Sequence, residues 1–275
     1  MLTILNSISS LNAENALSST QASLQKTLTE LSTGLRVNSG SDDAAGLSIA
    51  NGLAGNIAAL NQSVSNASDG IGVLQTADGA LSQVTTLLNR AVTLATEASN
   101  SGLSTSQYTA LDGEYQDILS EIGNIGSATT FNGAAVFGTG TNTNTVGAYI
   151  SDGTTAGSVS ITTALSALTA AGLGLKGDLT SAADAQKELT NITAAISTVA
   201  ADRGTIGATV NQLTASQNVA STEATNLTSA ENDIQNADVG QTVAQMTQYN
   251  VLEQTGMAAL SQSNQVQQSV LKLLQ

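Results

Sequence analysis

The sequence predicts a mainly α-helical protein, a long antiparallel helical bundle or coiled coil with a small β-hairpin region at one end. Apolar residues recur at helical spacing through most of the 275 residues, and the absence of proline leaves long helices uninterrupted. Two Phe, four Tyr and no Trp imply an aliphatic, alanine-rich core, which suits close packing of helices. We therefore expect the core to lie between helices.

Both ends of the chain carry an apolar stripe at helical spacing. The residues of these stripes are Ile4, Ile8, Leu11, Leu17, Leu24, Leu28, Leu31 and Leu35 at the start and Leu252, Leu260, Val270, Leu271 and Leu274 at the finish. A buried Leu or Ile contributes roughly 1.5–3 kcal/mol, so a terminal helix that leaves its stripe in water forgoes most of what would offset its ordering entropy. We expect both ends to be disordered in the monomer and to fold on assembly, when they pair as a coiled coil.

A helix break follows the first stripe. Gly34 and Gly40 relax the backbone, and Ser41 with Asp42 and Asp43 offers an N-cap followed by carboxylates beside the positive helix end. A second helix is therefore predicted to begin at this point.

Three further stripes predict the helices of the bundle. The first runs from Leu74 to Ala98 and the second from Leu111 to Ile125. The third, from Ile192 to Ile234, alternates spacings of four and three residues, as in a coiled coil. Arg203 occupies one position of that stripe, so we expect its guanidinium to be paired or to reach solvent.

The middle of the chain differs in composition. Residues 129–177 are rich in Gly, Thr, Asn and Ser, with short β-branched or alternating runs between turn signals, which predicts hairpins. A chain that goes helix, helix, hairpins, helix, helix brings its ends together. We expect a discontinuous terminal coiled-coil domain of residues 1–40 and 235–275, and a helical-bundle domain of residues 41–234.

Composition argues against catalysis. Without His or Cys the chain lacks the commonest general base, the thiol nucleophile and the usual zinc ligands, so we predict no catalytic residues, no cofactor and no metal site. Asp42 and Asp43 are interpreted as a helix start rather than as paired catalytic carboxylates, because adjacent side chains on a helix point to different faces.

Charge and hydropathy restrict the partners. Seven basic residues are scattered against 21 acidic ones, a net charge of -14, so no basic patch is available for nucleic acid. Copies of the chain should repel one another. Because salt screens this repulsion, self-association should be easier at higher salt. No apolar run is long enough to cross a bilayer, and the first residues lack the pattern of a cleaved secretory signal. The residues alone predict a cytoplasmic protein without membrane insertion.

Residues 31–50, LSTGLRVNSGSDDAAGLSIA, resemble the N-terminal signature of bacterial flagellins. The signature positions are Gly34, Arg36, Asn38, Asp42, Asp43 and Gly46. Further segments similar to the family follow in order, at residues 60–71, 75–81, 130–133, 146–148, 203–208, 236–238 and 264–274. The resemblance covers essentially the whole chain.

The resemblance implies a structural subunit that self-assembles into the helical filament of the bacterial flagellum for motility. It also implies type III export without a cleaved signal, and therefore a secreted, extracellular protein. Its partners would be further copies of itself, the export apparatus with an export chaperone, and the hook-filament junction and cap proteins. The terminal stripes would carry filament assembly. No separate outer domain is expected, because few residues separate the hairpins from the returning helix near Ser181.

Some flagellins are recognised by an innate immune receptor through a face that carries an Arg, a Leu and a Glu. Arg90, Leu94 and Glu114 match those positions here, whereas Val92 and Thr93 replace charged neighbours of the face. The resemblance thus gives a candidate receptor face, against the simpler interpretation of a solvated helix surface.

Two alternative functions remain. A hook-filament junction protein shares the plan of terminal helices but would form a short ring, and the close match at residues 31–50 favours the filament protein. A signalling helical hairpin of the chemotaxis-receptor type is also rich in Ala, Ser, Thr and Gln, but the central Gly/Thr block and the lack of a membrane anchor count against it.

Overall fold

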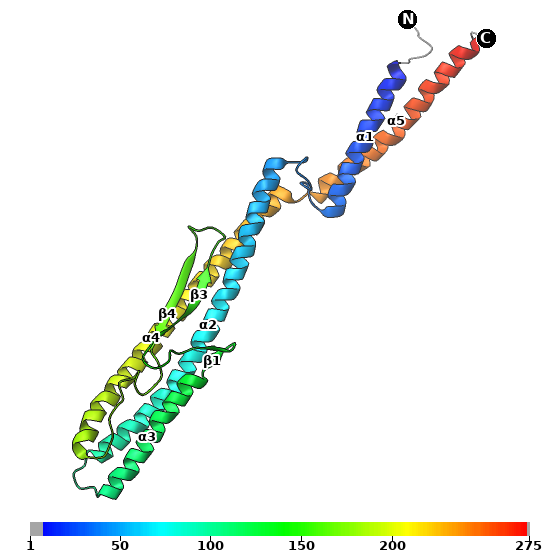
Figure 1. Cartoon of the computed structure of the whole chain (residues 1–275). Helices are drawn as coiled ribbons and strands as arrows, with labels where there is room; N and C mark the ends of the chain where they lie inside the picture. Colours follow the sequence, from blue (N-terminus) through cyan, green and yellow to red (C-terminus); the bar gives the residue numbers. More distant parts are fainter. Residues whose placement is uncertain (1–7, 274–275) are drawn as a thin grey trace. The chain divides into compact units, whose positions relative to one another are not determined.

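The computed structural model describes residues 8–273, which are mainly helical (Figure 1). The order of elements is α1 (Ile8–Thr33), α2 (Ala44–Ala98), α3 (Thr105–Ala128), β1 (Thr130–Phe131), β2 (Ala134–Ala135), β3 (Asn144–Ile150), β4 (Val159–Leu165), α4 (Ala182–Gln235) and α5 (Val239–Leu273). The chain divides into two compact units, one made of the described parts of Met1–Gly55 and Asn226–Gln275, the other of Asn56–Thr225. The predicted mainly helical fold is confirmed.

In the first unit α1 and α5 lie side by side in antiparallel directions (Figure 1). The Ser10 and Ser263 hydroxyls are 2.8 Å apart, and Gln21 Nε2 donates to Glu253 Oε1 at 3.1 Å, so residue numbers fall along α5 as they rise along α1. A Cβ at Gly256 would lie 3.3 Å from Leu17 Cδ1, which shows how closely the Leu17 side chain packs against α5 there. The predicted pairing of the terminal helices is confirmed. Their ordering only on assembly stays a prediction.

The second unit packs parts of α2 and α4 with the whole of α3 around an aliphatic core, and the predicted stripes supply it. Fully buried members include Leu74, Leu81, Val84, Leu88, Tyr115, Ile122, Ile192, Val199, Ile206 and Leu213. Arg203, in the α4 stripe, is ion-paired: its Nε donates to Asp78 Oδ1 of α2 at 2.7 Å. The expectation that this arginine is paired is therefore correct.

Two antiparallel hairpins occupy the middle of the chain. β1 and β2 join through Asn132 and Gly133, whose φ angles of 49° and 79° favour Asn and Gly in such a tight turn. β3 pairs with β4 over seven residues, from Asn144 opposite Leu165 to Ile150 opposite Val159. The predicted hairpins are therefore present.

The longer hairpin is fixed to α2 by polar and by close backbone contacts. Ser63 Oγ donates to the Ser151 carbonyl at 2.7 Å and accepts from the Ser151 N–H at 2.8 Å. A Cβ at Gly70 would lie 3.0 Å from Ala148 Cβ, so glycine allows the strand to approach the helix closely. The hairpin therefore has a defined position on the bundle.

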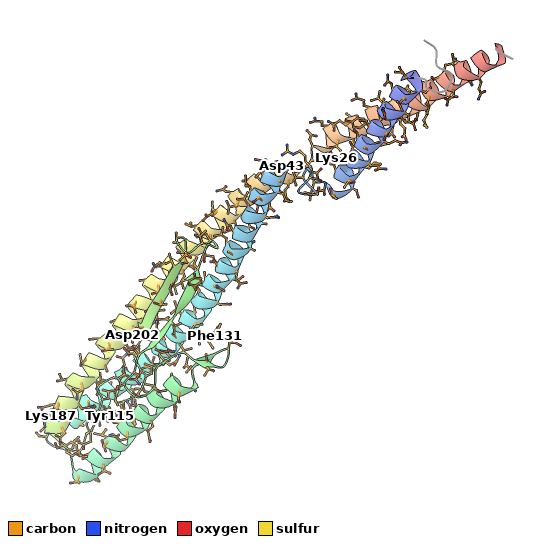
Figure 2. All side chains as sticks on the ribbon, turned by 45° about the horizontal axis from the view of Figure 1, so that its top comes forward. Lys26, Asp43, Tyr115, Phe131, Lys187 and Asp202 are labelled. Carbon is orange, nitrogen blue, oxygen red and sulfur yellow. The ribbon has the colours of Figure 1, made fainter. Side chains whose placement is uncertain are left out.

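The irregular segment between β4 and α4 is held by a buried carboxylate. Glu188 of α4 is only 1% exposed and accepts hydrogen bonds from Tyr115 Oη at 2.6 Å, Asn191 Nδ2 at 2.8 Å and the Gly177 N–H at 3.1 Å. Nearby, Asp112 Oδ1 accepts from the Leu179 N–H at 2.9 Å. The turn around residue 177 is thus held to both α3 and α4 (Tyr115 is labelled in Figure 2).

Candidate functional site

The signature residues gather where the passage from α1 to α2 meets the passage from α4 to α5. Gly34 ends α1 with a φ of 73°, in the left-handed region that favours glycine, and its N–H donates to the Glu30 carbonyl at 2.8 Å. Leu35 then forms an isolated antiparallel bridge with Asn236. We call residues 34–46 together with 234–238 the junction.

Backbone and guanidinium groups tie the two passages together. The Arg36 N–H donates to the Gln235 carbonyl at 2.6 Å, and Arg36 Nη2 donates to the Ile234 carbonyl at 2.8 Å. The Ala237 N–H returns a bond of 2.9 Å to the Gly34 carbonyl. Arg36 therefore satisfies carbonyls at the end of α4, which have no partner within the helix.

Asp42 organises the turn that leads into α2. Its Oδ2 accepts from the N–H groups of Asn38 and Ser39 at 3.3 and 3.0 Å, and its Oδ1 lies 3.1 Å from Lys26 Nζ of α1. The bonds from Lys26 and Ser39 lower the pKa of the Asp42 carboxyl, and Asp42 in turn raises the pKa of Lys26. Asn38 also donates through Nδ2 to the Leu35 carbonyl at 2.8 Å, which closes the turn.

Asp43, rather than Ser41, supplies the cap of α2. Its Oδ1 accepts from the Gly46 N–H at 2.8 Å, the geometry of an N-cap residue with the third residue of the helix. Ser41 instead contacts the hydroxyl of Ser39. A Cβ at Gly46 would collide with the Asp43 carboxylate, so the glycine leaves room for the cap. The predicted helix start is right, and its capping residue is corrected to Asp43 (labelled in Figure 2).

The terminal stripes remain partly uncovered although α1 and α5 pair. Ile8 is 75% exposed, and Leu11, Leu28 and Leu252 are also exposed. Half-buried members are Leu17, Leu24, Leu31, Leu35 and Leu260. Ile4 and Leu274 lie outside the described residues, as do the side chains of Val270 and Leu271.

The structure adds apolar residues on α5 that the sequence analysis missed. The exposed ones are Val239, Val243, Val251, Met257 and Val266. A signal was present, because Val239 and Val243 stand four apart and so lie on one face of a helix. The uncovered apolar surface on α5 is therefore larger than predicted.

The three residues of the candidate receptor face do not share one exposed surface. Arg90 and Glu114 are exposed and form an ion pair between α2 and α3, with 2.6 Å between Arg90 Nη2 and Glu114 Oε1. Leu94 is 1% exposed and belongs to the core. The expectation of a common face is corrected, since the α2 stripe that runs through Ala91 and Ala95 turns Leu94 inward.

Over the described residues, no group of His, Cys, Asp or Glu has the arrangement of a metal site. Within the same range, no helix combines the length and the apolarity needed to cross a membrane. The distinctive features of the described chain are thus the junction and the uncovered apolar side chains on α1 and α5.

Comparisons with known proteins agree at both ends of the chain. Residues 4–143 match the family model of the bacterial flagellin N-terminal helical region, and residues 189–274 match that of the C-terminal helical region. Flagellin of Bacillus subtilis (strain 168) is 32% identical over 300 residues, which cover 98% of each chain. The flagellar filament 33 kDa core protein of Treponema phagedenis is 31% identical over 281 residues, again with 98% of each chain covered. A crystal structure of Bacillus cereus flagellin has 29% identity and a TM-score of 0.48, and the match covers 61% of this chain and 94% of that one.

Proposed function

Because the chain belongs to the bacterial flagellin family, we propose that the apolar side chains of α1 and α5 are the surface through which its copies join into a filament. Flagellin is the filament subunit of the bacterial flagellum, so the protein is structural rather than enzymatic and is a component of the extracellular filament. The observation that supports the proposed surface is that apolar side chains remain exposed on both helices after these have paired.

The energetics favour burial of this surface against further copies. An apolar side chain moved from water into a packed interface gains roughly 25 cal/mol per Å² of surface removed from water. Leu11 on α1 and Leu252 and Met257 on α5 are about half exposed in the single chain, so each retains area to bury. Many copies that each bury these side chains can offset the repulsion between chains of charge -14.

We assign residues 1–40 and 235–275 to a terminal coiled-coil domain and residues 41–234 to the helical-bundle domain that follows the junction. The hydrogen bonds of Arg36 and the Lys26–Asp42 ion pair support this division, because they fix the backbone where α1 and α5 end and begin. The signature residues thus position α1 and α5 and have no catalytic role.

Further partner proteins can be proposed from the same uncovered apolar surface. A chain with exposed apolar stripes requires shielding before it assembles, so we propose an export chaperone that covers part of α5, with delivery through the flagellar export apparatus. The hook-filament junction and cap proteins would bind the same stripes at the two filament ends. Recognition by an innate immune receptor would have to rely on Arg90 and Glu114 without Leu94, which is buried.

Seeded growth tests the proposed surface. Purified chain is added to short sheared filament seeds at raised salt, and elongation is followed by electron microscopy. The comparison uses a chain without residues 235–275, the double variant Leu11→Ser with Leu252→Ser, and a control with the polar neighbours Asn12→Ser and Gln254→Ser.

We expect the intact chain and the polar control to grow, the truncated chain not to grow, and the double variant to grow at least tenfold more slowly, because each lost apolar contact removes about 1–2 kcal/mol. Growth of the double variant at the rate of the polar control would contradict an assembly role for these stripes.

A further inference from the structure

A groove opens in the second unit beside the turn of the longer hairpin. Its volume is about 470 Å³, and its wall includes Leu60 of α2, Val159 of β4 and Val219 of α4. Val219 is 65% exposed and Val159 is 53% exposed, so this groove leaves large apolar side chains in water. Figure 1 shows the β3–β4 hairpin lying along α2 and α4, the three elements that form the walls.

The rim of the groove is negatively charged. Asp152, in the turn between β3 and β4, and Glu223 of α4 both line it. The hydroxyl and N–H of Thr154 donate to Asp152 Oδ1 at 2.7 and 2.8 Å, and these bonds lower the pKa of Asp152 and favour its charged form. An occupant that suits this groove would carry a cation beside apolar atoms.

Lys176 makes no ion pair with any side chain that the structure describes. The other basic side chains that the structure describes are engaged: Lys26, Arg90, Lys187 and Arg203 in ion pairs, and Arg36 with a backbone carbonyl. Lys176 is exposed and sits between Leu175, which is buried, and Gly177, whose N–H is held by Glu188 at 3.1 Å. The turn therefore presents an ammonium group on four methylenes from a fixed backbone.

Lys176 cannot reach the groove of its own chain. Its turn is bonded to Glu188 near the start of α4, whereas the groove lies at Val219, 31 residues further along the same helix. At 1.5 Å per residue this separation is about 46 Å along the helix. A contact between the two sites therefore requires two copies. Two different patches that meet head to tail generate an open, repeating assembly when the rotation does not close.

We propose that the turn carrying Lys176 docks into the acidic groove at Asp152, Val219 and Glu223 of a second copy of this chain. The proposal rests on the filament function above and adds a contact between helical-bundle domains to the contacts of α1 and α5. It gives this otherwise acidic chain an attractive charge pair at a defined place, which favours one alignment of neighbouring copies over others.

Cysteine cross-linking tests the contact directly, because the natural chain has no cysteine. The variant Lys176→Cys with Glu223→Cys is grown on wild-type seeds and oxidised, beside a control with Lys187→Cys and Glu223→Cys. Lys187 lies at the same end of α4 and is exposed, but it is paired with Asp184 and is not part of the turn. A disulfide requires Cα atoms within about 7 Å, so a bond within one chain is excluded.

We expect a ladder of disulfide-linked multimers from the 176/223 variant in filaments, and none from it as free monomer or from the 187/223 control. Filaments that grow without the ladder would overturn the docking proposal and leave the filament function intact. Failure of the wild-type chain itself to grow on seeds would instead count against the filament function.

Charge exchange provides a second measurement that does not depend on oxidation. Lys176→Glu and Glu223→Lys should each slow elongation roughly tenfold, because each replaces an attractive pair by a repulsive one. The double exchange should restore most of the rate. A double variant as slow as the single variants would overturn the proposal, even if cross-links were seen.

Discussion

At the scale of the residue, Glu188 shows how the core of the second unit accommodates a carboxylate. Its three hydrogen-bond donors, Tyr115, Asn191 and the Gly177 N–H, are all neutral, so dipoles rather than a cation compensate the loss of water. Burial, together with the Glu188 carboxylate, raises the pKa of Tyr115 far above its ordinary value, and the phenol stays a donor. Each donor is therefore important to the stability of the segment before α4.

Tyr115→Phe should lower the free energy of unfolding by about 1–3 kcal/mol, because the buried carboxylate loses a donor while the ring still fills its space. Urea denaturation followed by circular dichroism measures the change. Tyr108→Phe is the matched control, since its hydroxyl donates to the exposed Asn100 carbonyl at 2.9 Å, and it should cost less than about 1 kcal/mol. Equal costs for the two substitutions would show that Glu188 does not depend on Tyr115.

Sequence reasoning reached some residues and missed others for identifiable reasons. It found the helix start at residues 41–43, but the choice of Asp43 as the cap depends on where the first helical residue falls, which sequence fixes only to within a residue or two. It missed Glu188, although this residue stands four before Ile192 and so continues the buried stripe of α4. A carboxylate at such a position signals a polar core contact, but its partner in α3 follows only from the three-dimensional packing.

At the scale of the element, periodicity predicted the helices well, because their buried faces repeat every three or four residues over many turns. The strands were harder to bound. Within the predicted hairpin region, β2 comprises only Ala134–Ala135, while Val136 and Phe137, which continue the same apolar run, are buried beyond its end. Short apolar runs specify burial, and whether a neighbouring strand is available to pair with them depends on the fold.

The pairing of α1 with α5 leads to a direct prediction. Since the Ser10 and Ser263 hydroxyls are 2.8 Å apart, Ser10→Cys with Ser263→Cys should form a disulfide within one chain on mild oxidation. Ser10→Cys with Ser261→Cys is the control, because a residue two positions away on a helix points to another side. Gel mobility without reductant, measured on assembled filaments, distinguishes the two variants. An absent bond in the 10/263 variant would mean that the two helices are not paired in the filament.

At the scale of the whole molecule, the charge of -14 controls how readily copies meet. With 21 acidic and 7 basic residues, repulsion between copies opposes the burial of α1 and α5 in an assembly. Composition alone predicted this property, because net charge requires no knowledge of the fold. The proposed contact that offsets it, between Lys176 and the groove of a second copy, could not be predicted in that way, since the groove forms only when α2, the β3–β4 hairpin and α4 pack together.

Salt should therefore accelerate assembly. Seeded elongation, followed by light scattering, should become several-fold faster between about 10 mM and about 150 mM salt, as the screening length falls from about 30 Å to about 8 Å. Lys176→Gln should grow more slowly than the natural chain at low salt and approach its rate at high salt, because the pair it removes is itself screened. A rate independent of salt would contradict control of assembly by charge.

The junction also determines the order in which the chain can fold. Ser10 meets Ser263 and Arg36 meets Ile234, sequence separations of 253 and 198 residues, whereas the second unit is built from the continuous stretch 56–225. Closing so long a loop costs more entropy than closing the local turns of the bundle, and contacts of high sequence separation form late. Whichever end of the chain emerges first, the second unit can form before the last of the two terminal helices, α1 or α5, has emerged. The paired helices α1 and α5 are therefore the last to be completed in each newly delivered subunit.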